Sequence, residues 1–231
     1  MGIATFFPLR CPVCDKILPI GGEKICKKCY HKLSFVKEPS CKKCGKQLQN
    51  QEEEYCSDCR TKPHLYKRGI GLLENRGISQ KSIYAIKYKN KREYVDFYTD
   101  EIAKRYGGEI DYWKADLIMP VPLHKKKLIK RGFNQAEVIA KSLSQKLGIP
   151  VSGSLERVKN TVPLKTLKGS ERRNCLAEAF RADEPAVRGK RIILVDDIYT
   201  TGSTIDECSR ELKAKGARET FFITLAIGDG M

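Results

Sequence analysis

Residues 191–227, RIILVDDIYTTGSTIDECSRELKAKGARETFFITLAI, indicate the fold class of most of this chain. An apolar run at residues 192–195 is flanked by charged residues, which indicates a short strand buried on both faces of a sheet. The next segment has apolar side chains at helical spacing and predicts a helix that begins at Ser203 or Thr204 and ends at Gly216. Residues 221–227 then predict a second strand. The stretch is therefore a strand–helix–strand unit, typical of a parallel α/β sheet.

Residues 196–202 are predicted to form the loop that leads from the first strand into this helix. Ligands bind at this place in open α/β sheets. The first turn of a helix offers unpaired backbone N–H groups and partial positive charge, both of which suit a phosphate. Gly202 lets the backbone approach a ligand closely because it has no Cβ. Neighbouring hydroxyl donors are supplied by Thr200, Thr201, Ser203 and Thr204.

Two acidic residues, Asp196 and Asp197, come directly before these hydroxyls. Adjacent carboxylates can accept hydrogen bonds from two vicinal ribose hydroxyls, or help to hold a hydrated Mg²⁺. The competing interpretation is a plain turn with a helix-capping acid pair. The order of strand, acids, hydroxyl-rich loop with glycine, and helix favours a ligand site. Neither the G-x-x-x-x-G-K-[ST] motif nor a G-x-G-x-x-G motif after a strand is present.

The region before this unit continues the α/β pattern. A strand is predicted at 117–121, and helices are predicted at 79–88, 93–106 and 134–147. Together these elements predict an α/β domain from residue 64 to residue 231, with a central parallel sheet flanked by helices.

Eight of the ten cysteines lie before residue 60, in four CxxC pairs whose starts are spaced by 15 residues. They are Cys11, Cys14, Cys26, Cys29, Cys41, Cys44, Cys56 and Cys59. Two CxxC knuckles together complete a tetrahedral zinc site of four thiolates. Residues 1–63 are therefore predicted to form a double zinc ribbon with two structural Zn²⁺ ions. A segment this short has little core of its own, so zinc binding and folding are expected to be coupled.

Other cysteine chemistry fits less well. Disulfides require an oxidising compartment, and a thioredoxin-like motif uses a single CxxC within a βαβ unit. Sequential and cross-braced pairing of the knuckles have the same spacing, and sequential pairing is favoured. His31 and His64 are expected to be surface histidines, and Cys175 and Cys208 are expected to be buried thiols.

The net charge of +16 arises from 44 basic and 28 acidic residues and favours a polyanionic partner or an anionic substrate. Neither a signal peptide nor a membrane segment is indicated, so the chain is predicted to be cytoplasmic, without membrane insertion. Basic clusters at 87–92 and 124–131 suit a pyrophosphate group or nucleic-acid phosphates, although charge runs are commonly solvated faces. Tyrosines 84, 88, 94 and 98 are equally consistent with base stacking and with packing, and no site is assigned to them.

Residues 195–204, VDDIYTTGST, resemble the signature of type I phosphoribosyltransferases. Three further features narrow the resemblance: the duplicated CxxC unit, PVPL at 120–123 with RGFNQ at 131–135, and Arg173-Asn174 with Phe180. With these features, the chain as a whole resembles the ComF/GntX family of competence-associated proteins.

This resemblance implies a double zinc ribbon fused to a type I phosphoribosyltransferase-like domain. It implies binding of phosphoribosyl pyrophosphate with Mg²⁺, and a role in natural transformation with single-stranded DNA and other DNA-uptake proteins as partners. By the same likeness, Asp196 and Asp197 are the catalytic pair, and phosphoribosyl pyrophosphate contacts Val195, Asp196, Asp197, Thr200, Thr201, Gly202, Ser203 and Thr204. Pyrophosphate is assigned to Pro122, Leu123, His124 and Arg131. Family members often carry a glutamine near the position of Leu164, so the 161–168 loop receives no role.

Three functions are compatible with these residues. The first is a DNA-handling protein that uses its transferase domain as a sensor of phosphoribosyl pyrophosphate or as an enzyme with an unknown acceptor. The second is a nucleobase salvage phosphoribosyltransferase, which would need a base pocket that the sequence does not reveal. The third is a zinc-ribbon nucleic-acid-binding protein with a non-catalytic transferase domain. The acceptor, the occurrence of turnover, the DNA-binding face and the oligomeric state are left open by the sequence.

Overall fold

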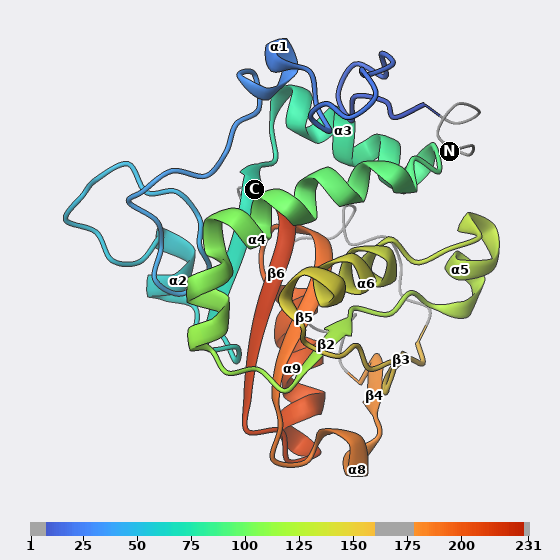
Figure 1. Ribbon diagram of the computed structural model, residues 1–231. Coiled ribbons are helices and arrows are strands. Elements are labelled where there is room, and N and C mark those ends of the chain that lie inside the picture. The colour runs from blue at the N-terminus through green and yellow to red at the C-terminus, as the bar shows by residue number, and fades with distance from the viewer. Residues whose placement is uncertain (1–7, 160–177, 229–231) are drawn as a thin grey trace.

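The computed structural model of the protein describes residues 8–159 and 178–228, and its centre is a parallel sheet (Figure 1). The sheet has four strands in the order β1-β6-β5-β2, and every neighbouring pair is parallel. The strands are β1 (Arg68–Glu74), β2 (Leu117–Pro120), β5 (Arg191–Tyr199) and β6 (Glu219–Ile227). The predicted α/β class with a central parallel sheet is therefore confirmed.

Helices cover both faces of this sheet. The α-helices are α1 (Lys27–Tyr30), α2 (Ser57–Thr61), α3 (Gly77–Tyr88), α4 (Val95–Tyr112), α5 (Lys125–Arg131), α6 (Gln135–Leu147), α8 (Glu184–Val187) and α9 (Ser203–Ala214). A 3₁₀ turn, η1 (Arg92–Tyr94), precedes α4, and a small antiparallel pair is formed by β3 (Leu155–Arg157) and β4 (Phe180–Ala182).

Successive side chains of β5 point to opposite faces of the sheet and enter two different cores. Ile193 and Val195 belong to the core that includes apolar residues of α3, α4 and α6. Ile192 and Leu194 belong to the core that includes residues of α9. All four are fully buried, which explains why this part of the strand reads as a continuous apolar run.

Most predicted elements are confirmed, including the helix that starts at Ser203, but two boundaries are wrong. The helix predicted at 93–106 continues as α4 to Tyr112. Residues 196–202 are not all loop, because β5 continues to Tyr199. Asp196 pairs with Thr224, and Tyr199 pairs with Ile227, so β6 offers backbone partners along the whole extension. The connection to α9 is therefore short, and Thr200–Gly202 is called the β5–α9 loop below.

Both cysteine-rich segments pack against the α/β domain (Figure 1). Cys11 and Leu18 of the first ribbon share the core of α3 and α4, whereas Cys41 and Leu48 of the second share the core of α9. The second segment also covers the edge strand β1, where Gly69 N–H donates to the carbonyl of Lys43 at 2.9 Å. This contact protects the open sheet edge from other strands. The boundary at residues 63 and 64 stays a prediction.

Among the described helices, none combines the length and the apolar character that crossing a bilayer requires.

Candidate functional site

The eight N-terminal cysteines form two groups of four. The first group is Cys11, Cys14, Cys26 and Cys29, and the second is Cys41, Cys44, Cys56 and Cys59; within each, all sulfur atoms lie within 4.8 Å of one another. A tetrahedral zinc site with Zn–S bonds of about 2.3 Å separates its sulfurs by about 3.8 Å. The Cys11–Cys26 and Cys44–Cys56 sulfur distances are 3.8 and 3.7 Å, far longer than a disulfide bond of about 2.05 Å. The residues fit two zinc ions in the sequential arrangement.

Local backbone geometry builds these knuckles. Cys26 and Cys56 stand at the starts of α1 and α2, and Gly45 N–H donates to the carbonyl of Cys41 at 2.8 Å to close a tight turn. Gly45 has a φ of 76°, and a Cβ there would lie 2.6 Å from the carbonyl oxygen of Gly69 in β1. Glycine is therefore required at this position both by the turn and by the close approach of the ribbon to the sheet.

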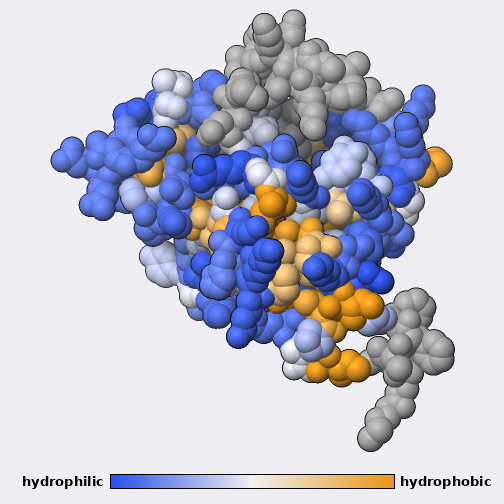
Figure 2. All heavy atoms as spheres, turned by 90° about the horizontal axis from the view of Figure 1, so that it is seen from above, coloured by the Kyte–Doolittle hydropathy of each residue, from blue (hydrophilic) through white to orange (hydrophobic). Residues whose placement is uncertain are grey.

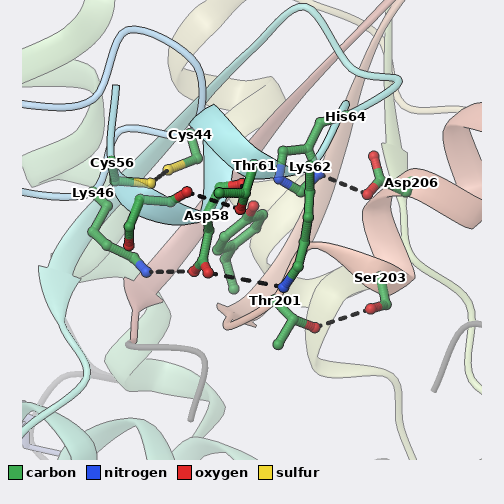
Figure 3. Close-up of polar contacts among 12 residues, drawn as sticks. Cys44, Lys46, Cys56, Asp58, Thr61, Lys62, His64, Thr201, Ser203 and Asp206 are labelled. Carbon is green, nitrogen blue, oxygen red and sulfur yellow. Dashed lines mark hydrogen bonds and ion pairs between the residues drawn. The ribbon is translucent and has the colours of Figure 1, made fainter. Parts of the chain in front are cut away.

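The β5–α9 loop borders a hollow at the carboxyl end of β5. This hollow is lined by Asp196 and by residues 198–205. Gly202 is the N-cap of α9 with a φ of 76°, and among the described residues no side chain caps this helix. The first N–H groups of α9 consequently have no intrahelical partner. Thr201 Oγ1 and Ser203 Oγ lie 3.0 Å apart beside them (Figure 3).

The two acids next to the loop lie in different surroundings. Asp196 is half-buried and lines the hollow, and its Oδ1 accepts a hydrogen bond from the backbone N–H of Asp197 at 2.8 Å. Burial and the negative charge of Asp197 raise the pKa of Asp196 to about 7. The side chain of Asp197 is 6% exposed, and its Oδ2 lies 2.7 Å from Nζ of Lys87. The structure thus places Asp196, and not Asp197, in the wall of the hollow.

Lys87 also belongs to this site. The sequence places it only in the basic cluster at 87–92, and its contact with Asp197 was not predicted. Burial opposes its charge, but the charge and hydrogen bond of Asp197 outweigh burial and raise the pKa of Lys87. Gln135 of α6 adds a longer contact, with its Nε2 3.4 Å from Asp197 Oδ2. A signal was present in the sequence, because Lys87 follows the buried Ile83 by four residues and so shares its helix face.

The residues assigned to pyrophosphate lie on the chain that leaves β2. Val121 N–H donates to the carbonyl of Val195 at 2.9 Å, which places Pro122, Leu123 and His124 just beyond the adjacent strand end. His124 Nδ1 accepts from the backbone N–H of Lys126 at 3.2 Å and caps α5. Arg131, at the end of α5, donates to Gln135 Oε1 and therefore connects to Asp197 through that amide.

The chain between α2 and β1 passes against the start of α9. His64 Nδ1 lies 2.7 Å from Asp206 Oδ2, and Leu65 N–H donates to Asp206 Oδ1 at 2.9 Å. Figure 3 shows this contact, with the second ribbon on one side and the β5–α9 loop on the other. Behind it, the hydroxyls of the buried Tyr66 and Tyr199 lie 2.7 Å apart.

The expectation that His64 is a surface histidine is wrong, since its side chain is 2% exposed. The ring is buried because it lies between Asp206 of α9 and the ring of Tyr66, whose centroid is 5.0 Å from its own. Cys208 is a buried thiol, as predicted, and burial raises its pKa. Arg173, Asn174, Cys175 and the 161–168 loop lie outside the described residues.

Two domain families match the chain. Residues 3–60 match the family described as a double zinc ribbon domain, and residues 134–229 match the phosphoribosyl transferase domain family. These matches agree with the two cysteine clusters and with the strand–loop–helix unit described above.

Curated relatives also align with the chain. Competence protein F of Haemophilus influenzae is 37% identical over 107 residues, which cover 45% of this chain and 47% of that protein. DNA utilization protein YhgH of Escherichia coli O157:H7 is 37% identical over 103 residues, covering 44% and 45%. Competence protein ComFC of Bacillus subtilis is 28% identical over 138 residues, covering 59% and 54%. The chain thus spans about half the length of the curated relatives it matches.

A purine phosphoribosyltransferase from Pyrococcus horikoshii superposes with a TM-score of 0.36 and 22% identity, covering 58% of this chain and 73% of that one. The chain therefore carries a double zinc ribbon domain ahead of a phosphoribosyl transferase domain, and over about half of its length it is similar to competence protein F and to competence protein ComFC.

Proposed function

We propose that this protein binds phosphoribosyl pyrophosphate at the β5–α9 loop. The 5-phosphate is held by the N–H groups at the start of α9 and by the hydroxyls of Thr200, Thr201, Ser203 and Thr204. Asp196 faces the ribose hydroxyls. The observation that carries the proposal is the open hollow at an uncapped helix start, with a carboxylate in its wall.

Charge balance supports a role for Mg²⁺ beside this ligand. Magnesium prefers carboxylate oxygens and phosphate oxygens. Asp196 has no cationic side chain bonded to it in the described part of the chain, whereas Asp197 is already paired with Lys87. Asp196 therefore fits the metal better than Asp197. A bound Mg²⁺ would supply positive charge for the pyrophosphate group, while Lys87 would stay paired with Asp197 behind it.

The same proposal extends to DNA handling in the cytoplasm. Relatives carry the names competence protein and DNA utilization protein, and this chain has a net charge of +16. We therefore infer single-stranded DNA as a partner and other DNA-uptake proteins as its associates. A polyanion contacted through lysine and arginine should bind with an affinity that falls as salt is added.

Calorimetric titration with phosphoribosyl pyrophosphate and Mg²⁺ tests the loop. Gly202→Ala places a Cβ 2.6 Å from the Tyr199 hydroxyl at a φ of 76°, so binding should be lost. Gly148→Ala is the matched control: its φ is 70°, it ends α6, and an added Cβ meets nothing within 4 Å.

Both substitutions strain the backbone, but only in Gly202→Ala does the new Cβ collide with neighbouring side chains, Tyr199 and His64, so that the loop has to shift. Equal loss in the two variants would attribute the effect to lowered stability. Binding that survives in Gly202→Ala would refute the assignment. Release of pyrophosphate with single-stranded DNA or free bases as acceptors then distinguishes turnover from sensing.

A further inference from the structure

Helix α3 presents a pair of tyrosine rings to the solvent. Tyr84 and Tyr88 are 54% and 53% exposed, and their ring centroids lie 4.5 Å apart at an interplanar angle of 37°. They are separated by one helical turn, so the two rings lie next to each other on the helix surface. The opposite face of α3 carries the buried Ile83 and Ile86. The tyrosine pair, Tyr84 and Tyr88, is therefore not needed for the core.

Cations surround this tyrosine pair. The guanidinium carbon of Arg131 lies 5.4 Å from the Tyr88 ring centroid, and Lys87 Nζ lies 6.0 Å from it. Four exposed lysines have no carboxylate partner in the described residues; they are Lys89, Lys125, Lys126 and Lys130. Three of these four belong to α5, which also contains Arg131. The face of the molecule seen in Figure 2 is hydrophilic over much of its area, with hydrophobic residues gathered near its centre and on one side.

The tyrosine pair is adjacent to the acid pair. Lys87 Nζ contacts Asp197 at 2.7 Å and lies 6.0 Å from the Tyr88 ring. A second connection runs from Tyr88 through Arg131 and Gln135 to Asp197. A molecule stacked on Tyr88 would consequently lie beside the proposed ribose site.

We propose that the tyrosine pair and the α5 lysines form a binding surface for single-stranded DNA. Unpaired bases stack on Tyr84 and Tyr88, and the phosphates run along the cations of α5. Aromatic rings beside a basic track are the arrangement that binds single strands without reading sequence, and rings need unstacked bases, which a duplex does not offer. The choice of DNA over RNA rests on the proposed function; the surface itself rests on exposure and charge.

Fluorescence anisotropy with a labelled oligothymidylate of about 20 nucleotides tests this surface. The double variant Tyr84→Leu with Tyr88→Leu should raise the dissociation constant about tenfold or more, because each stacked base is lost. The double variant with phenylalanine at both positions retains the rings and should bind like the wild type. Tyr112→Leu is the matched control, since Tyr112 is 83% exposed at the end of α4.

An abasic strand of the same length separates stacking from phosphate contacts. The wild type should bind it more weakly than oligothymidylate, and the leucine double variant should not distinguish the two strands. Wild-type affinity in the leucine variant, or equal binding of abasic and thymidylate strands by the wild type, overturns the proposal. Tighter binding of oligouridylate overturns the commitment to DNA.

Zinc content and urea unfolding are recorded for every variant, and the phenylalanine pair keeps the test valid if the leucine pair unfolds. Titration of the wild type with phosphoribosyl pyrophosphate runs in parallel. Tyrosine-dependent DNA binding without ligand binding leaves this surface in place and refutes the proposed loop site. Binding of phosphoribosyl pyrophosphate without tyrosine-dependent DNA binding refutes only the proposed DNA surface.

Discussion

Lys87 Nζ lies 2.7 Å from Asp197 Oδ2, and this ion pair joins the end of helix α3 to the acid pair on β5. It holds Asp197 away from the hollow and leaves Asp196 as the carboxylate that lines it. Neighbouring acids on one strand thereby lie in different surroundings: Asp197 is paired with a lysine, and Asp196 lines the hollow. Alternation of side chains along a strand is the physical basis of this division.

Removing the lysine should leave a buried charge without compensation. Lys87→Met is expected to lower the free energy of unfolding by about 2 to 4 kcal/mol, because Asp197 then stays buried and unpaired. Urea denaturation measures the change. Lys141→Met is the matched control, since it removes an exposed pair with Glu137 worth less than about 1 kcal/mol. Adding Asp197→Asn to Lys87→Met should recover most of the lost free energy of unfolding. If the effects of the two substitutions were simply additive in a double-mutant cycle, the prediction would be wrong.

Stability should depend on pH through Asp196. Its pKa is raised from 3.8 to about 7, so between these values the folded protein binds more protons than the unfolded chain. The contribution of Asp196 to the free energy of unfolding is complete below pH 3.8 and is lost as the pH rises through about 7. Asp196→Asn stays neutral, so its stability should decline less than that of the wild type between pH 4 and pH 8. If the free energies of unfolding of the wild type and of Asp196→Asn changed in parallel with pH, the pKa of Asp196 would not be raised. Asp111→Asn serves as the control, because Asp111 is exposed.

Zinc should be bound in two independent portions. Cys44→Ser is expected to reduce the zinc content from two ions to one per chain, as measured by elemental analysis, because only the second group of thiols is broken. Cys14→Ser should remove the other ion. Loss of both ions from either single variant would show that the two sites do not form independently of each other.

The Cys44→Ser protein should also unfold at lower urea than the wild type. Cys44 shares its core with Tyr66 and Tyr199, so the metal-free ribbon would loosen the packing behind the β5–α9 loop. An unchanged urea midpoint would show that this core forms without the metal.

Asp206 should stabilise the junction between the ribbon and α9. Asp206→Ala leaves the His64 ring and the Leu65 N–H without their acceptor, at a cost of about 1 to 3 kcal/mol in unfolding free energy. Asp206→Asn keeps one acceptor oxygen and should lose less. Thermal or urea unfolding compares the two variants. Asp111→Ala is the suitable control, since its ion pair with Lys114 is exposed.

Local sequence patterns were sufficient for the elements and for the metal ligands. The apolar run at 192–195, the helical spacing after Ser203 and the repeated CxxC pairs each depend on neighbours a few residues away, and the structure confirms all three. The end of β5 could not be predicted in this way, because it depends on how far β6 extends alongside.

Local sequence patterns were enough to predict what stands at the carboxyl end of β5: two acids, a row of hydroxyls and a glycine before a helix. The partners of these residues follow from the folded arrangement alone. Lys87 lies 110 residues before Asp197, and His64 lies 142 residues before Asp206, so neither pairing leaves a local pattern. These contacts exist because α3 packs on the sheet and because residues 64 and 65 lie against α9, and both arrangements depend on long-range burial of apolar surface.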